Sequence, residues 1–233
     1  METAVNQSVK RILVWDLPTR AFHWLLAVSF LGAFLTAESE RYRDIHIVLG
    51  YTVLGLVAFR FLWGAIGTRY ARFKSFPIAP RRVLEYLKSL FTRSPQHHTG
   101  HNPAGSLAIY AILALALLAS VTGYAAYNEI GGEWLAKLHE GAANAMLGLV
   151  AVHIGAVAVS SLIHRENLAA SMLNGYKNGR ASEGIRSKHR FVAAAVILAT
   201  VGFWAVSAWL LPEGMAIPAT AAVSHQKARG GNG

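Results

Sequence analysis

The chain has 233 residues, of which 54% are hydrophobic and only 15% are charged. Soluble domains carry about 25% charged residues, so this composition favours a membrane protein. The sequence contains no cysteine, which excludes disulfides, thiolate metal sites, thiol catalysis and a haem attached covalently through a C-x-x-C-H motif. A net charge of +10 would also suit nucleic-acid binding. The positions of the basic residues along the chain distinguish that function from membrane topology.

Five apolar segments approach the roughly 20 helical residues that cross a hydrocarbon core of about 30 Å. Before the first of them, Asp16 can cap a helix and Pro18 suits the first helical turn. The first segment lacks a small-residue cleavage site, so we do not expect a cleaved signal peptide. We expect membrane-spanning helices at residues 21–37, 45–67, 104–127, 135–163 and 191–211, the last ended by Pro212.

Basic residues are distributed unevenly between the connecting segments. Sixteen of the 22 Lys and Arg residues fall in segments 1–20, 67–103 and 164–190, and five fall in the other connections and the C-terminal tail. Basic residues accumulate on the cytoplasmic side of a membrane. We therefore expect a cytoplasmic N-terminus, two cytoplasmic basic loops and a periplasmic C-terminus. The charge reflects topology, and we expect no nucleic-acid binding.

Ten histidines fall into two groups. Four lie within or at the edges of apolar spans, where ionisable groups are costly and are functional candidates; these are His23, His46, His139 and His153. The other six lie in polar connections or near helix ends, where we expect solvated side chains, although two of them, His98 and His101, could contact lipid headgroups or a ligand. These six are His97, His98, His101, His164, His189 and His225.

The spacing of the four membrane histidines is informative. His139 and His153 are 14 residues apart, and 14 helical residues rise about 21 Å and complete nearly four turns. Both therefore lie on one face of the fourth helix, one near each membrane surface. His23 lies near the cytoplasmic start of the first helix, and His46 near the outer start of the second. Each membrane level thus combines one histidine of the fourth helix with one of another helix.

Two facing imidazoles at one depth suit a bis-histidine haem, whose iron both rings bind axially. Helical bundles hold such cofactors between facing helices. Two alternatives stay open: core histidines bonded to Ser or Thr of neighbouring helices, and a zinc site, which the few ligands at each level disfavour. Glycines inside the spans suit either a macrocycle close to the backbone or simple helix packing; they are Gly50, Gly55, Gly123, Gly141 and Gly148.

Arg60 is the one basic residue deep inside a span. It follows His46 by 14 residues, so it shares a face with that residue but lies at the level of His23 and His153. No acidic residue of the five predicted helices lies at this depth, and a haem would bring two propionates there. We expect Arg60 to bind those propionates; the alternative is that it snorkels to the inner headgroups.

Several motifs, in order along the chain, resemble the bacterial cytochrome b561 family, which includes the cytochrome b subunits of membrane-bound nickel–iron hydrogenases. The likeness covers residues 10–180. The motifs are "VWDLPTRAFHW" (14–24), "HIVLGYTVLGLVAFRFLWGAIG" (46–67), "GHNPAG" (100–105), "HEGAANAMLGLVAVHIGAV" (139–157) and "SSLIHRENLAASMLNGYKNG" (160–179).

The resemblance implies an all-α integral membrane protein, a four-helix transmembrane bundle holding two b haems. It pairs His23 with His153 and His46 with His139 as axial ligands of the haem irons. A fifth, C-terminal transmembrane helix lies outside that bundle. We therefore expect a di-haem cytochrome b domain at residues 10–180, followed at 181–233 by the end of a cytoplasmic linker, the fifth helix and a short periplasmic tail.

We expect transfer of electrons across the bacterial inner membrane, between a quinone pool and a periplasmic redox partner. By resemblance the partner is a c-type cytochrome, a hydrogenase or another dehydrogenase. The chain then acts as an electron-transfer protein or oxidoreductase subunit rather than a complete enzyme, in an oxidoreductase complex or a homo-oligomer. The alternative is a stand-alone oxidoreductase that passes electrons from superoxide to quinone, which acidic residues in outer segments 38–45 and 128–138 disfavour. A transporter would need midplane carboxylates, which the spans lack.

Overall fold

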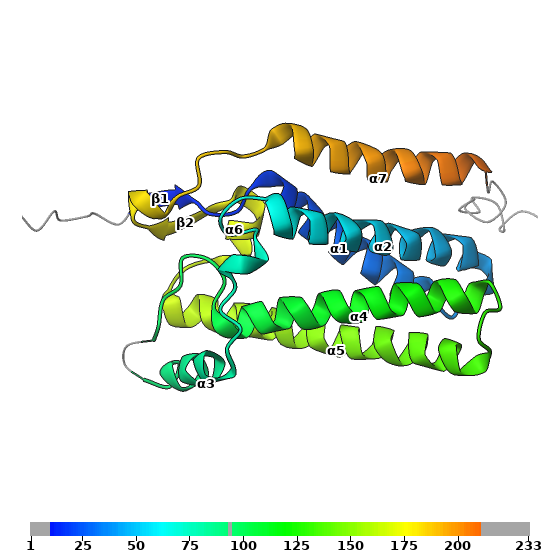
Figure 1. The fold of residues 1–233 in the computed structure, drawn as a ribbon, viewed down its shortest axis with the longest axis horizontal. Coiled ribbons are helices and arrows are strands. Elements are labelled where there is room, and N and C mark those ends of the chain that lie inside the picture. Colours follow the sequence, from blue (N-terminus) through cyan, green and yellow to red (C-terminus); the bar gives the residue numbers. More distant parts are fainter. Residues whose placement is uncertain (1–9, 93–94, 211–233) are drawn as a thin grey trace, which may run out of the picture.

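The computed structural model describes residues 10–92 and 95–210 (Figure 1). The protein is an all-α, multi-pass integral membrane protein, and its five long apolar helices coincide with the five predicted segments. Pro212, the C-terminal tail with His225, and residues 1–9 lie outside the described residues. The long helices are α1 (Leu17–Thr36), α2 (Arg43–Ile66), α4 (Pro103–Tyr127), α5 (Glu133–His164) and α7 (Arg190–Leu210).

Two of the long helices begin at side-chain caps, of which the sequence predicted the one at Asp16. Asp16 accepts a hydrogen bond from the backbone N–H of Thr19 at 2.8 Å, and Pro18 follows in the first turn of α1. Asn102 accepts one from the N–H of Gly105 at 2.6 Å, just before α4. Each cap satisfies a backbone donor that the first helical turn leaves without a partner, so both helix starts are locally encoded.

The long helices form two closely packed pairs, α1 with α2 and α4 with α5, and α2 also packs against α4. In the described part of the chain, α1 and α5 are not closely packed together. The fifth helix, α7, lies along the outside of α1 and α2 (Figure 1). The bundle core combines aromatic and aliphatic side chains of all four inner helices; its buried members are Phe22, Leu26, Phe30, Val53, Leu56, Val57, Leu113, Ala116 and Met146.

One end of the bundle carries a folded cap where the sequence predicted only loops (Figure 1). Strands β1 (Lys10–Leu13) and β2 (Tyr176–Gly179) pair antiparallel there. Two short helices, α3 (Pro80–Ser89) and α6 (Leu168–Asn174), lie at the same end. We call this the strand end. The opposite end holds the α1–α2 connection with the 3₁₀ turn η1 (Glu40–Tyr42) and the α4–α5 connection.

A small apolar cluster holds the cap together. Ile12, Val14, Trp15 and Tyr70 are buried against one another, with Met172 and Ile185 packed beside them. These residues come from three segments of the chain that are rich in basic side chains. The mean hydropathy of each segment is low because basic residues surround these apolar side chains. The sequence therefore gives no clear signal for the cap.

Candidate functional site

At the opposite end, the rings of His46 on α2 and His139 on α5 face one another. Their centroids are 5.9 Å apart and their planes are inclined at 86°. The Nδ1 atom of His46 lies 2.8 Å from the carbonyl oxygen of Ala33, and that of His139 lies 2.8 Å from that of Ala119. A carbonyl only accepts, so each Nδ1 donates, and each Nε2 is left as the lone-pair nitrogen. Metal-binding histidines are commonly oriented in this way.

Gly123 on α4 makes room for one of these rings. A Cβ atom at this position would lie 2.9 Å from both Nδ1 and Cε1 of His139, closer than real Cβ contacts. The four other glycines singled out in the spans have no atom within 4 Å of such a Cβ. They therefore leave open space beside the backbone and do not serve close helix packing. These four are Gly50, Gly55, Gly141 and Gly148.

At the strand end, His23 on α1 and His153 on α5 are both partly buried. They lie close enough to interact electrostatically. The His23 ring packs edge-on against Trp24, with ring centroids 5.0 Å apart. Within residues 10–92 and 95–210, its Nδ1 atom is covered and has no hydrogen-bond partner. Buried polar atoms are nearly always paired, so this nitrogen suits a group that the chain itself does not supply.

Arg60 is only 2% exposed, and both Arg60 and His153 interact electrostatically with His101 at the strand end. Its guanidinium stands over the ring of Phe73 at 4.6 Å and lies 5.7 Å from that of Phe76. The atom Nη1 is covered and makes no hydrogen bond to any described residue. Such burial does not fit a side chain that snorkels to the headgroups. A buried guanidinium with an unused donor suits an anionic ligand.

Asp16, expected from the sequence only as a helix cap, is the acidic residue that interacts electrostatically with Arg60. Asp16 is 1% exposed. Besides the Thr19 N–H, its carboxylate accepts from Nε1 of Trp63 at 3.1 Å and from the hydroxyl of Thr68 at 2.6 Å. This carboxylate is therefore saturated with donors, and it attracts Arg60 over a distance without occupying its unused Nη1.

His101 is not the solvated loop residue that the sequence suggested. Its ring lies between those of Trp15 and Phe76, at centroid distances of 4.6 and 4.4 Å. Although the residue as a whole keeps some exposure, its Nδ1 is covered and unpaired within the described chain. Burial, followed by the charges of Arg60 and Lys177, lowers the pKa of His101 to about 3. The ring is therefore neutral at physiological pH, and no local sequence pattern indicated this packing.

The other strand-end histidines differ in their exposure. His98 packs edge-on against Tyr86, with ring centroids 5.6 Å apart, and burial lowers its pKa. Nζ of Lys177 donates to the carbonyl oxygen of His98 at 2.9 Å. His97 is half exposed and lies 3.6 Å from Glu166. His164 and His189 contact the rings of His97 and Trp63, respectively.

Taken together, these positions fit b-type haems better than a bare metal ion. In the described ranges, no three His, Cys, Asp or Glu side chains converge to hold a metal ion. Both ends instead offer two ring nitrogens, from helices that face each other across the bundle. The separation of α1 from α5 is compatible with a macrocycle held between those two helices.

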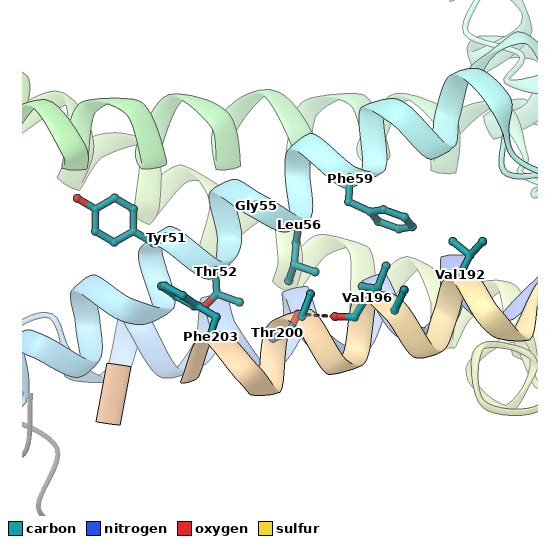
Figure 2. A pocket seen from close by; sticks show the side chains of 11 residues that line it. Tyr51, Thr52, Gly55, Leu56, Phe59, Val192, Val196, Thr200 and Phe203 are labelled. Carbon is teal, nitrogen blue, oxygen red and sulfur yellow. Dashed lines mark hydrogen bonds between the residues drawn. The ribbon is translucent and has the colours of Figure 1, made fainter. Parts of the chain in front are cut away.

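A groove of about 780 Å³ lies elsewhere, between α2 and α7 (Figure 2). It is lined mostly by apolar side chains, among them Leu56, Phe59 and Val196. Thr52 accepts a hydrogen bond from Nε1 of Trp204 at 2.9 Å, which ties α7 to α2. The groove contains none of the four candidate ligands, so it is separate from the histidine sites.

Comparison with known proteins supports the family suggested by the motifs. The profile of the family described as prokaryotic cytochrome b561 matches residues 14–175. The probable Ni/Fe-hydrogenase B-type cytochrome subunits of Azotobacter chroococcum and Azotobacter vinelandii are each 24% identical to this chain over 229 residues, covering 76% of this chain and 94% of the relative. The corresponding protein of Rhizobium leguminosarum is 24% identical over 210 residues, with 70% and 87% covered.

No solved structure matches the chain. The family match nevertheless spans well over half of its length and includes all four membrane histidines. Members of this family are b-type cytochromes, membrane proteins that bind haem b and transfer electrons. The chain belongs to the prokaryotic cytochrome b561 family.

Proposed function

We propose that this protein carries electrons across the membrane by means of two non-covalently bound b haems. His46 and His139 are the axial ligands at the opposite end, and His23 and His153 are those at the strand end. When bound, haem supplies the reversible one-electron chemistry of its iron. The chain contributes the ligand nitrogens, excludes water and places charges that tune the reduction potential.

The observation that carries this proposal is the pair of rings at the opposite end. His46 and His139 face each other, and both direct Nδ1 to a backbone carbonyl, which fixes the tautomer and leaves Nε2 for iron. His153 lies 14 residues after His139, about 21 Å along α5. A second pair at that distance turns one binding site into a path through the bilayer.

At the strand end, we assign Arg60 to the propionates of the haem. Its unused Nη1 is a donor in an apolar environment, where an unpaired charge is costly. A propionate would supply both the charge and the acceptor. Asp16 offsets part of the charge, but its oxygens already accept from Thr19, Trp63 and Thr68.

We further propose that the electrons pass between a membrane quinone and a periplasmic redox protein, within the inner membrane. The relatives named as hydrogenase subunits favour a nickel–iron hydrogenase as partner, so the chain would be one subunit of an oxidoreductase complex. Residues 10–180 would form the haem domain, and residues 181–233 would add α7 and the tail. The wide separation of the two histidine pairs supports a path that links two membrane surfaces.

Haem quantification tests the proposal directly. The purified protein should contain two protohaems per chain in a pyridine haemochrome assay. His153→Ala should lose the strand-end haem and His139→Ala the other, each with the remaining haem largely retained. His97→Ala, at a half-exposed position, is the control and should keep both. Haem near zero in the wild-type protein, or both haems retained in either ligand variant, would contradict the assignment.

Orientation requires a separate experiment. The concentration of basic residues at the strand end favours the cytoplasm for that end. Reporter fusions after Gly179 should therefore behave as cytoplasmic, and fusions after Pro212 as periplasmic. The reverse pattern would place the strand-end histidines at the periplasmic surface.

A further inference from the structure

Helix α3 has an apolar stripe that the rest of the protein does not cover. Leu84, Leu87 and Phe91, the last just beyond the helix, are 54%, 42% and 93% exposed. At 100° per residue, these three lie within about 60° of arc. Tyr86, on another side of the helix, is only 2% exposed and packs onto the protein. The stripe is thus the outward face of a helix that is itself held firmly in place.

Basic side chains border this stripe. Lys88 lies about 40° from Leu84 around the helix, and Arg81 about 60°. Arg81 pairs with Glu85 at 2.8 Å, and both side chains are at least half exposed. Nearby, the exposed residues Arg72 and Lys74 add to the positive charge of the same segment. An apolar stripe bordered by Lys and Arg is typical of helices that lie at the boundary between headgroups and acyl chains.

The position of α3 brings a membrane within reach. The helix packs against α4 and lies at the strand end, on the side of the bundle away from α7 (Figure 1). The five long helices are long and apolar enough to cross a bilayer, which puts their ends at its surface. A short helix beside those ends therefore meets the headgroup region of one leaflet.

We propose that α3 and Phe91 form a binding surface for the anionic lipids of the leaflet at the strand end. Leu84, Leu87 and Phe91 enter the region below the headgroups, while Lys88 and Arg81 attract lipid phosphates. This inference does not depend on haem, and it concerns a part of the chain that the electron-transfer proposal does not use.

The surface is connected to the strand-end site. The hydroxyl of Tyr86 accepts a hydrogen bond from Nδ2 of Asn102 at 2.9 Å, and Asn102 in turn caps α4. The Tyr86 ring also packs against His98. Lipid binding on the outer side of α3 would therefore stabilise residues 98–102, which include His101, through the contacts of Tyr86.

The chain has no cysteine, which permits clean labelling at single sites. The variants Leu84→Cys and Phe91→Cys, and the controls Arg82→Cys and Glu85→Cys at exposed positions of α3 outside the apolar stripe, would each carry an environment-sensitive fluorophore. The full-length proteins are placed in phosphatidylcholine vesicles with roughly 30% phosphatidylglycerol and nitroxide-labelled lipid. We expect at least twofold stronger quenching at positions 84 and 91 than at positions 82 and 85. Far-UV circular dichroism checks that all four fold.

The charge requirement is tested in the same vesicles. With the label at position 91, Lys88→Gln should lower the ratio of lipid-bound to lipid-free surface about fivefold, the effect of one basic residue near an anionic surface. Arg82→Gln, on the far side of the helix, should change the ratio much less. Equal quenching at all four labelled positions would overturn the proposal and indicate that a protein partner or solvent covers the stripe. Quenching at position 91 that is unchanged in pure phosphatidylcholine would overturn the role of anionic lipid.

Discussion

The two ends of the bundle place their histidine pairs in different surroundings. At the opposite end, the carbonyl oxygens of Ala33 and Ala119 orient His46 and His139, so helix packing alone sets the rings. At the strand end, Nδ1 of His23 is covered and has no partner among the described residues, and three charged side chains, Asp16, Arg60 and Lys177, are buried. Helices can position two rings by themselves, whereas several buried charges require a folded cap that excludes water.

The difference also separates two kinds of tuning. The opposite end offers neutral carbonyl partners, which fix geometry and raise ligand basicity. The strand end adds Arg60 and the saturated carboxylate of Asp16, which act through charge. Substitutions at one end should therefore change geometry and occupancy, and substitutions at the other should change potential and stability.

The largest effect is expected for Gly123→Ala. The new Cβ would lie 2.9 Å from the ring of His139, which would displace the ring from the Ala119 carbonyl. Loss of such an orienting contact typically costs 10- to 100-fold in metal affinity, so the opposite-end haem should be lost on purification and the strand-end haem retained. Haem per chain and the reduced-minus-oxidised spectrum measure this. Gly202→Ala, where a Cβ meets no atom within 4 Å, is the control. Full occupancy in Gly123→Ala would show that the ring has room to shift.

Asp16→Asn should destabilise the strand end. The carboxylate accepts from a backbone N–H, an indole N–H and a hydroxyl, and an amide turns one acceptor into a donor that faces them. We expect a loss of about 1–3 kcal/mol in unfolding free energy, seen as a lower Tm in detergent and weaker retention of the strand-end haem. Asp44→Asn, in the first turn of α2, removes the same charge and should cost less, about 0.3–1 kcal/mol. Equal losses in both variants would contradict the role of Asp16 as a buried hub.

Arg60→Gln should lower the reduction potential or occupancy of the strand-end haem, because a cation that stabilises the more negative reduced form is removed. A shift of tens of millivolts is expected, since a tenfold change in a one-electron equilibrium is about 59 mV. Redox titration of both haems measures it, and the opposite-end potential serves as an internal reference. Arg60→Lys keeps the charge but not the planar fork and should shift the potential less. An unchanged strand-end potential with full occupancy would remove Arg60 from the site.

The smallest effect concerns pH. Burial, with the charges of Arg60, Lys177 and His153 around the ring, lowers the pKa of His101 from 6.5 to about 3. Between these values the unfolded chain binds a proton that the folded chain does not, so stability is lost as the pH falls below about 6.5 and continues to fall towards about 3. The loss from this group is about 1 kcal/mol at pH 6. Thermal unfolding measured from pH 7.5 to 5.5 should show that Tm depends less on pH in His101→Gln than in the wild-type protein. Identical slopes would show that the pKa of His101 is not lowered in the folded protein.

The sequence alone determined the long helices and the two histidine levels. Hydropathy over about 20 residues marks a span, and the interval from His139 to His153 follows from helical rise alone. Both are local properties, so neither needs knowledge of a neighbouring helix. The cap at Asp16 was readable for the same reason, because it bonds a backbone N–H three residues away.

Only the tertiary structure decided what surrounds the histidines. The carbonyl partners of His46 and His139 belong to other helices, and ordinary alanines carry them. The burial of His101 depends on Trp15, whose indole N–H donates to Ser171, 156 residues away in the chain. Asp16 accepts an additional hydrogen bond from Thr68, which lies just after α2 and 52 residues away in the chain. These contacts join residues distant in sequence, and no local pattern of hydropathy or spacing records which distant side chains will meet.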